Sequence, residues 1–450
     1  MDSFTLVIFG ITSNLAQIKL IPTLYDLFAN NRIGANFTVI GIGRKPMNLA
    51  DFNAYVGKTL RTKNRHHSNL IDPNIESKLL SHLEYLPVDL TDHASFIRLK
   101  ELIQSSPNST NRMYYLATFP SLYHSIFSQL KSVNLTGEKN SLPRHGGGWT
   151  RVLIEKPIGT DRDSAADLNQ LLTEYFEEDQ IFRLDHYLGK ETLQEVLNFR
   201  FNSSTLESEI SNTTVDHIQV TAAEDYGIGL RGSYYDQNGA LKDVGQNHLL
   251  QMIALATMNK PGEFTNEAVT AERVNILKSL VPEPTTLVIG QYKGFHQEQH
   301  ISPDSLSETF FAFRTTIDND RFSGVPIYVR GGKYLTKIDT VVHVVFKNSD
   351  VLTYRLSDQG GITLQTSTST KEFANIGDRV AADAYDRLIL DALKGDQTYF
   401  NDTAEIDAQW VFTDALLAQK HGMKPIIYEK GSWGPAQADE LIQKDGRSWI

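Results

Sequence analysis

Hydrophobic and polar positions along the first third of the chain follow the pattern of strands that alternate with helices. Apolar residues recur at helical spacing over 15–28 and 94–103. Short apolar runs before, between and after them predict buried strands at 5–9, 37–42, 83–88, 112–116 and 151–154. Because such alternation forms a parallel sheet with helices on both faces, we predict a doubly wound, Rossmann-like α/β domain.

Beyond residue 180 the pattern changes. Strand-like segments follow one another with little helix between them, at 215–222, 286–292, 309–317, 326–330, 341–346 and 351–356. Helical spacing is confined to 241–258, 382–393 and 403–419. Runs of strands without intervening helices favour a large, mainly antiparallel sheet. We therefore predict two domains, a Rossmann-like one at 1–180 and an α+β one at 181–450.

Composition narrows the classes of protein. The 450 residues are too many for one compact core, which supports two domains. A net charge of −11 disfavours non-specific binding to nucleic acid or to anionic membranes. The absence of cysteine excludes disulfides and thiolate catalysis. Since neither a signal peptide nor a membrane-spanning segment is recognisable, we expect a cytoplasmic location.

The first strand-to-helix turn carries Gly10, followed by Thr12, Ser13 and Asn14. A glycine here allows a tight turn beneath a dinucleotide pyrophosphate, which the helix N-terminus then binds. The three glycines usual in such turns are absent, however. A plain strand-to-helix turn, with Thr12, Ser13 or Asn14 as N-cap, remains an equal alternative at this point.

Cations follow two of the predicted strands. Arg44 and Lys45 stand at the end of the second strand, where an NAD-specific fold often carries Asp or Glu. Basic residues there instead accommodate a 2′-phosphate, which favours NADP. Lys156, between Glu155 and Pro157, follows a later strand and adds a cation to the same predicted edge, although such a triplet is often only a turn.

The segment 183–191 holds the densest group of reactive side chains. His186, Tyr187 and Lys190 could together bind a phosphate through charge-assisted hydrogen bonds. Asp185 could orient a histidine from elsewhere in the chain. A capping aspartate among surface charges is the structural alternative, but it leaves this density of functional groups unexplained.

His248 lies in the helical segment 241–258, five residues after Asp243. A histidine in an apolar helix is most often a hydrogen-bonded packing residue. Here its polar neighbours make a polar pocket plausible. Oxidation of an alcohol by hydride transfer needs a base for the hydroxyl proton, and histidine is the usual one near neutral pH.

Taken together, these motifs resemble the glucose-6-phosphate dehydrogenase family over nearly the whole chain. The segments that carry the resemblance are 155–159, 183–191, 235–251, 328–333 and 431–449. The resemblance implies oxidation of C1 of glucose 6-phosphate to 6-phosphogluconolactone, the first step of the oxidative pentose phosphate pathway. It implies NADP as hydride acceptor, with NAD as a weaker alternative, no metal, and a homodimer or homotetramer.

The resemblance also implies residue roles. His248 would be the general base, paired with Asp185 in the manner of a catalytic triad. Substrate binding would fall to Lys19, Lys156, His186, Tyr187, Lys190, Glu224, Asp243, Lys333 and Lys337. Cofactor binding would fall to Gly10, Thr12, Ser13, Asn14, Leu15, Arg44, Lys45, Asp89 and Lys156.

Four departures from the family pattern lie mainly around the ligands. Ser13-Asn14 replaces the family's Gly-Asp in the first turn, and Lys337 stands closer to Lys333 than the family's second lysine does. The stretch 203–211 lacks the expected aromatic residues, and Ser357 stands where a sugar-contacting Gln often occurs. Two other readings stay open. A glucose–fructose oxidoreductase-like enzyme would oxidise free sugars, and a catalytically silent homologue would serve as a regulator or an oligomer partner.

Overall fold

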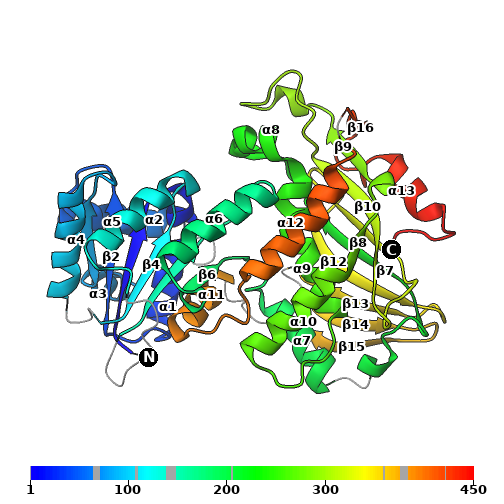
Figure 1. The fold of residues 1–450 in the computed structure, drawn as a ribbon, viewed down its shortest axis with the longest axis horizontal. Helices are drawn as coiled ribbons and strands as arrows, with labels where there is room; N and C mark the ends of the chain where they lie inside the picture. Colours follow the sequence, from blue (N-terminus) through cyan, green and yellow to red (C-terminus); the bar gives the residue numbers. More distant parts are fainter. Residues whose placement is uncertain are drawn as a thin grey trace. The chain divides into compact units, whose positions relative to one another are not determined.

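The computed structural model describes residues 2–63, 71–106, 110–137, 148–203, 206–357, 360–375, 384–420 and 422–450. The chain divides into two compact units. Unit 1 comprises Met1–Ile158, Ala166–Gly189 and Ala382–Asp402, and unit 2 comprises Gly159–Ala165, Lys190–Ala381 and Thr403–Ile450. Figure 1 shows both as ribbons coloured along the sequence. Within the described ranges, no helix has the length and apolar character needed to cross a bilayer.

Unit 1 is built on a six-stranded parallel sheet in the order β3-β2-β1-β4-β5-β6. The strands are β1 (Phe4–Phe9), β2 (Phe37–Gly43), β3 (Leu83–Pro87), β4 (Arg112–Leu116), β5 (Thr150–Ile154) and β6 (Ile181–Arg183). The strand order reverses between β1 and β4, and open α/β sheets bind ligands at the carboxyl ends of strands around such a point. The predicted doubly wound parallel sheet is confirmed.

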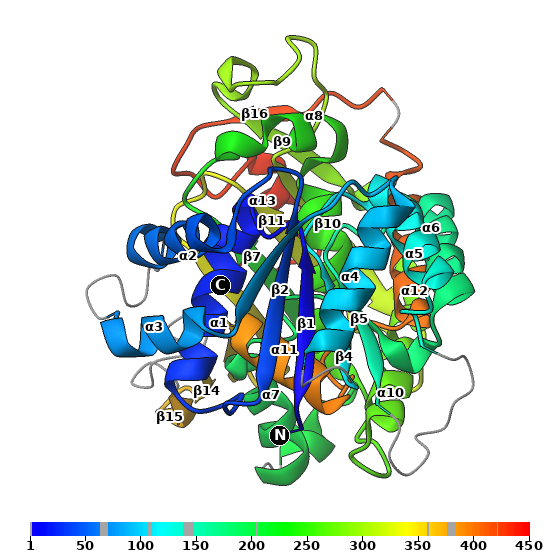
Figure 2. The same ribbon diagram turned by 90° about the vertical axis from the view of Figure 1, so that its left-hand side faces the viewer.

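Helices cover both faces of this sheet. They are a π-helix (Ala16–Leu20) that continues into α1 (Ile21–Ala29), then α2 (Leu49–Lys63), α3 (Pro73–Leu80), α4 (His93–Ser105), α5 (Tyr123–Ser132), α6 (Arg162–Tyr175) and α11 (Ala384–Lys394). In Figure 2, α1, α2 and α3 lie on one side of the strands and α4 and α5 on the other. Helix α11 comes from the last quarter of the sequence but packs against α1 within unit 1.

Unit 2 contains a mixed sheet in the order β15-β14-β13-β12-β7-β11-β10-β9-β16, with β8 paired to β10. Only two described pairs, β7 with β11 and β9 with β16, are parallel, so the predicted mainly antiparallel sheet is confirmed. The strands are β7 (Val215–Ala223), β8 (Leu280–Pro282), β9 (Val288–Tyr292), β10 (Phe310–Ile317), β11 (Ile327–Gly332), β12 (Asp339–Phe346), β13 (Val351–Arg355), β14 (Gly361–Gln365), β15 (Thr370–Asn375) and β16 (Ile426–Tyr428).

The helices of unit 2 are α7 (Glu191–Asn198), a π-helix (Phe199–Ser203), α8 (Gly232–Ala240), a second π-helix (Leu241–Leu249) that continues into α9 (Leu250–Thr257), α10 (Asn266–Ser279), α12 (Thr403–Leu417) and α13 (Ala436–Gln443). The second π-helix and α9 pack on one face of the sheet, against β7, β11 and β12. Figure 1 shows α9, α10 and α12 side by side, and α10 contacts both of the others. Ile218 and Val220 of β7 are fully buried, as expected of strand positions that face this helical layer.

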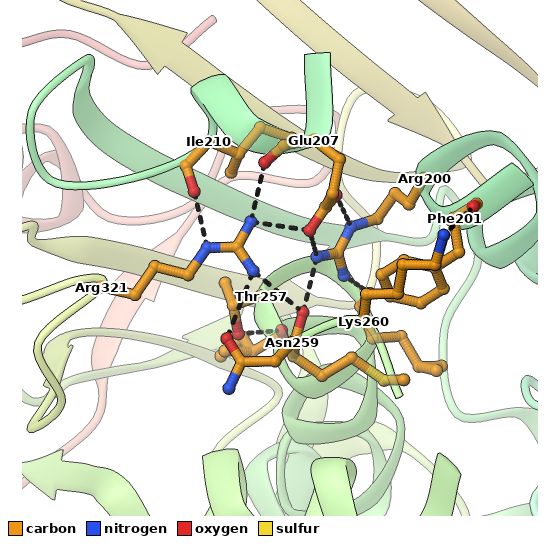
Figure 3. A network of polar contacts seen from close by, with 11 residues as sticks. Arg200, Phe201, Glu207, Ile210, Thr257, Asn259, Lys260 and Arg321 are labelled. Atoms are coloured by element: carbon orange, nitrogen blue, oxygen red, sulfur yellow. Dashed lines mark hydrogen bonds and ion pairs between the residues drawn. The ribbon is translucent and has the colours of Figure 1, made fainter. Parts of the chain in front are cut away.

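The C-terminal end of α9 is closed by a polar network (Figure 3). The buried Arg200 guanidinium donates to the carbonyl of Leu255 at 2.5 Å and to that of Met258 at 2.6 Å. The last carbonyls of a helix have no partner within it, so these bonds satisfy groups that would otherwise be costly to bury. Glu207 pairs with Arg200 at 2.7 Å and with Arg321 at 2.7 Å.

The C-terminal residues lie along the sheet face opposite these helices. Gln219 alternates with Ile218 and Val220 on β7, so it points to that other face, where its amide donates to the carbonyl of Ser448 at 2.9 Å. The Arg330 guanidinium contacts two indole rings, 4.5 Å from the centroid of Trp433 and 4.2 Å from that of Trp449. Cation–π contacts with both rings restrain the guanidinium.

Candidate active site

The turn after β1 requires glycine. Gly10 has a φ of +86°, and a Cβ placed there would lie 2.4 Å from the carbonyl oxygen of Ala117. Ser13 Oγ accepts the N–H of Ala16 at 3.1 Å, so Ser13 is the residue that caps the helix. Thr12 and Asn14 are exposed beside it, and Leu15 is the next residue of the helix. The turn therefore presents polar groups at a helix N-terminus, where an anion is stabilised.

The loop after β2 lies next to this turn. The N–H groups of Gly10 and Ile11 donate to the carbonyl of Ile42 at 3.0 and 3.1 Å. Arg44 and Lys45, which follow within three residues, are exposed. The hydroxyl of Tyr85 donates to the carbonyl of Lys45 at 2.5 Å and so fixes the loop that carries both cations.

Asp89 follows β3 at the same edge of the sheet. Its carboxylate accepts the N–H of Thr91 at 2.9 Å and the hydroxyl of Thr91 at 2.7 Å. These hydrogen bonds lower the pKa of Asp89 below its ordinary value. The Asp89 side chain thus stabilises the turn to Thr91. A role of Asp89 in cofactor binding stays a prediction.

Glu155 and Lys156 follow β5, with a cis peptide bond between Lys156 and Pro157. The hydroxyl of Tyr115 donates to Glu155, and Tyr385 from α11 donates to it as well. Burial raises the pKa of Glu155, although both tyrosine hydrogen bonds oppose that rise. Lys19 lies 5.5 Å from the ring centroid of Tyr385, so the two predicted lysines flank one carboxylate–tyrosine cluster.

Sequence reasoning missed Tyr115 and Tyr385. Tyr115 is the last residue but one of β4, a strand that ends at the predicted ligand-binding edge, and this position was the available signal. Tyr385 reaches the cluster only because α11 returns to unit 1, and no local pattern predicts that return.

The segment after β6 is ordered around Asp185, which is 1% exposed. Its Oδ1 accepts the N–H of Tyr187 at 2.8 Å. The rings of His186 and Tyr187 meet edge to face, with centroids 4.9 Å apart. Lys190 is the N-cap residue of α7 in unit 2, and its ammonium donates to the carbonyl of Leu356 at 3.2 Å.

In unit 2, Asp243 and His248 share the π-helix Leu241–Leu249, and both are buried. Such helices are rare and frequent at functional sites. Asn247 Oδ1 accepts the N–H of His248 at 2.6 Å. Arg231 binds both carboxylate oxygens of Asp243, at 2.7 and 3.1 Å, which adds a residue that sequence reasoning did not select.

Glu224 and Lys333 are brought together by the parallel pairing of β7 with β11. Each directly follows its strand, and the Lys333 ammonium forms an ion pair with the Glu224 carboxylate. The same ammonium lies 5.5 Å from the ring centroid of Tyr235, whose hydroxyl donates to Asp243 at 2.7 Å. Three predicted substrate residues, Glu224, Asp243 and Lys333, therefore form one connected cluster in unit 2.

Lys337 lies apart from that cluster. Its ammonium pairs with Asp339 at 3.0 Å, and its side chain helps to line a cavity of about 330 Å³ beside Trp433 and Trp449. A direct role of Lys337 in substrate binding stays a prediction.

Comparisons with known proteins agree with these features. The family model described as "Glucose-6-phosphate dehydrogenase, NAD binding domain" matches residues 7–195. The model described as "Glucose-6-phosphate dehydrogenase, C-terminal domain" matches residues 197–450. A glucose-6-phosphate 1-dehydrogenase of Aggregatibacter actinomycetemcomitans is 36% identical, over 100% of this chain and 97% of its own. That of Bacillus subtilis is 34% identical, over 99% and 97%.

Solved structures give the same result. A glucose-6-phosphate 1-dehydrogenase from Mycobacterium avium is similar with a TM-score of 0.86 and 30% identity, over 100% of this chain and 99% of the other. A glucose-6-phosphate dehydrogenase in complex with its substrate glucose 6-phosphate has a TM-score of 0.89 and 28% identity, over the same shares. The chain therefore belongs to the glucose-6-phosphate dehydrogenase family.

Proposed function

We propose that this protein is a glucose-6-phosphate 1-dehydrogenase that oxidises C1 of glucose 6-phosphate to 6-phosphogluconolactone. The observation that carries the proposal is the Glu224–Lys333–Tyr235–Asp243 cluster, because His248 shares its π-helix with Asp243. The cluster offers carboxylates and an ammonium suited to sugar hydroxyls, and the histidine offers a base. The relative solved with glucose 6-phosphate supports this choice of substrate.

In the proposed mechanism, His248 accepts the proton of the C1 hydroxyl while the hydride leaves C1. Asp185 stabilises the resulting imidazolium, as the carboxylate of a catalytic triad does. His186, Tyr187 and Lys190 bind the 6-phosphate through charge-assisted hydrogen bonds. Lys19 and Lys156 are assigned to the place where sugar and cofactor meet. Their position beside the Tyr115–Glu155–Tyr385 cluster supports this assignment, because the cluster orders that edge of the sheet.

A nicotinamide dinucleotide supplies the hydride acceptor when bound, and we propose that NADP is preferred to NAD. Gly10 and the capped turn after it fit a pyrophosphate. Arg44 and Lys45 fit a 2′-phosphate, since they are exposed cations beside that turn. The chemistry needs no metal. A cytoplasmic location and a homodimer or homotetramer complete the proposal, by resemblance to the family.

The test is turnover by the purified full chain, followed by the absorbance of the reduced nicotinamide. We expect oxidation of glucose 6-phosphate, much weaker oxidation of free glucose, and a preference for NADP. Equal use of free and phosphorylated sugar would favour a glucose–fructose oxidoreductase-like enzyme. No turnover of either sugar would favour a catalytically silent homologue.

A variant then tests the base. His248→Asn keeps the shape of the side chain but removes the proton acceptor. General-base catalysis typically contributes about 10²–10⁴-fold, so kcat should fall by that order while KM changes little. Near-normal turnover in this variant would remove His248 from the mechanism.

A further inference from the structure

Arg231 ends a short turn (Gly229–Arg231) immediately before α8, and its guanidinium contacts Asp243. We propose that Arg231 is a positioning residue that fixes the carboxylate of Asp243 for one sugar hydroxyl and so sets the enzyme's selectivity for that hydroxyl. This proposal rests on the proposed function, in which Asp243 binds the sugar.

The contact has the geometry of a bidentate pair. Nη2 of Arg231 donates to Oδ1 of Asp243 at 2.7 Å, and Nη1 donates to Oδ2 at 3.1 Å. The hydroxyl of Tyr235 donates to Oδ2 at 2.7 Å. A planar fork on both oxygens fixes the plane of a carboxylate, which the single ammonium of a lysine cannot do. Arg231 and Tyr235 therefore both orient the Asp243 carboxylate.

Arg231 is itself held by aromatic rings. Its guanidinium carbon lies 4.8 Å from the ring centroid of Tyr234 and 5.3 Å from that of Tyr235. Its side chain is 47% exposed, whereas that of Asp243 is 2% exposed. The guanidinium thus reaches inward from the surface to a buried carboxylate and restrains its position.

The charges around Asp243 define what it can recognise. Burial lowers the pKa of Arg231, but the charge and hydrogen bonds of Asp243 outweigh this and raise it above the ordinary value. Burial, with the charge of Asp243, raises the pKa of Tyr235 well above its ordinary value. Both partners therefore stay protonated donors near neutral pH. A carboxylate among donors is an acceptor, which suits it to a sugar hydroxyl that donates its proton.

Tyr235 extends this order to the rest of the cluster. Its ring lies under the ammonium of Lys333, and Lys333 pairs with Glu224. A displaced Asp243 would free the Tyr235 hydroxyl and disturb this neighbouring pair. We therefore expect a change at Arg231 to act on sugar binding chiefly through Asp243 and Tyr235.

The experiment uses Arg231→Lys, which keeps the charge but loses the fork, and Arg231→Gln, which loses both. Catalytic efficiency is measured for glucose 6-phosphate and for its 2-, 3- and 4-deoxy analogues. Asp243→Asn provides the reference. One deoxy analogue should be turned over by this variant as well as by wild type, and that analogue lacks the hydroxyl that Asp243 binds. For Arg231→Lys we expect a loss of about ten- to a hundredfold with glucose 6-phosphate and little loss with that analogue.

A double variant separates positioning from a general structural effect. If Arg231 acts through Asp243, the loss in Arg231→Lys/Asp243→Asn equals that of Asp243→Asn alone, because interacting sites are non-additive. Additive losses, or equal losses with every analogue, would overturn the proposal. The control is Arg162→Lys, which alters an exposed ion pair with Asp407 (2.8 Å). It should leave the ratio of catalytic efficiencies between glucose 6-phosphate and each analogue unchanged.

Failure of the proposed function would look different. In that case the wild-type chain itself would not turn over glucose 6-phosphate, and the role of Arg231 would fall with it. The melting temperature of each variant reports folding. If Arg231→Gln does not fold, Arg231→Lys and the double variant still decide the question.

Discussion

Glu207 pairs with two arginines at the end of α9, and its removal should strongly destabilise unit 2. Arg200 is fully buried, and Glu207 accepts from it twice, at 2.9 and 2.7 Å. Arg321 makes a third bond to the same carboxylate at 2.7 Å (Figure 3). Removing one partner of a buried pair leaves an uncompensated charge, which typically costs about 3–5 kcal/mol.

Two substitutions of Glu207, to Gln and to Ala, should differ in how much they destabilise the protein. Glu207→Gln keeps one acceptor oxygen, so Arg200 retains one hydrogen bond and the cost should be about 3 kcal/mol. Glu207→Ala removes both and should approach about 5 kcal/mol. For a unit of this size, each kcal/mol lowers Tm by about 2–4 °C, which gives a decrease of roughly 6–20 °C across the pair.

Thermal unfolding followed by circular dichroism measures both variants. Glu429→Gln is the matched control, since its pair with Lys293 at 2.9 Å is exposed and should contribute little. High salt should restore little of the loss from Glu207, because a buried charge is poorly screened. A decrease of Tm in Glu207→Gln no larger than in the control would refute the reasoning that Arg200 depends on this carboxylate.

Three further predictions concern cofactor, substrate and pH. Arg44→Ala should raise KM for NADP about ten- to a hundredfold and leave that for NAD nearly unchanged; equal losses would exclude Arg44 from the 2′-phosphate. Lys190→Ala should impair turnover of glucose 6-phosphate far more than that of free glucose, and equal losses would show that Lys190 does not bind the phosphate. Burial and Arg355 lower the pKa of His343 to about 4, below the ordinary value of about 6.5. The unfolded chain therefore binds this proton first, and stability should fall by about 2 kcal/mol between pH 7 and pH 5. His343→Gln should reduce that difference in chemical denaturation, and an unchanged difference would contradict the assignment.

The sequence did not predict the short strands β6, β8 and β16 or the more exposed β14 and β15. It did predict the strands that form apolar runs, because burial makes most of their positions hydrophobic. Residues 5–9 and 112–116, for example, are short apolar runs that end at polar or glycine positions, and the structure confirms them as β1 and β4. The two parallel pairs within the second sheet could not be predicted in this way. Strand order depends on long-range pairing, such as Tyr328 with Gln219, which leaves no local pattern.

Candidate site residues could be selected from the sequence where a short segment holds an unusual density of reactive side chains. Asp185 and His186 stand out for that reason, and Ser13 was one of three possible caps that the structure reduces to one. Arg231 was not selected because an arginine in a loop is ordinarily a solvated charge. The role proposed for it rests on a contact with Asp243 across twelve residues, which only the folded chain reveals.

The π-helix Leu241–Leu249 fixes the rotational phase of His248 relative to Asp243. An α-helix turns by about 100° per residue, so two residues five positions apart would lie about 140° apart around it. The wider turn of the π-helix, with its i→i+5 hydrogen bonds, instead brings Asp243 and His248 onto one face. An insertion of one residue between them would separate the two side chains. A deletion of one residue that let the segment wind as an α-helix would leave a four-residue spacing, which keeps both on one face.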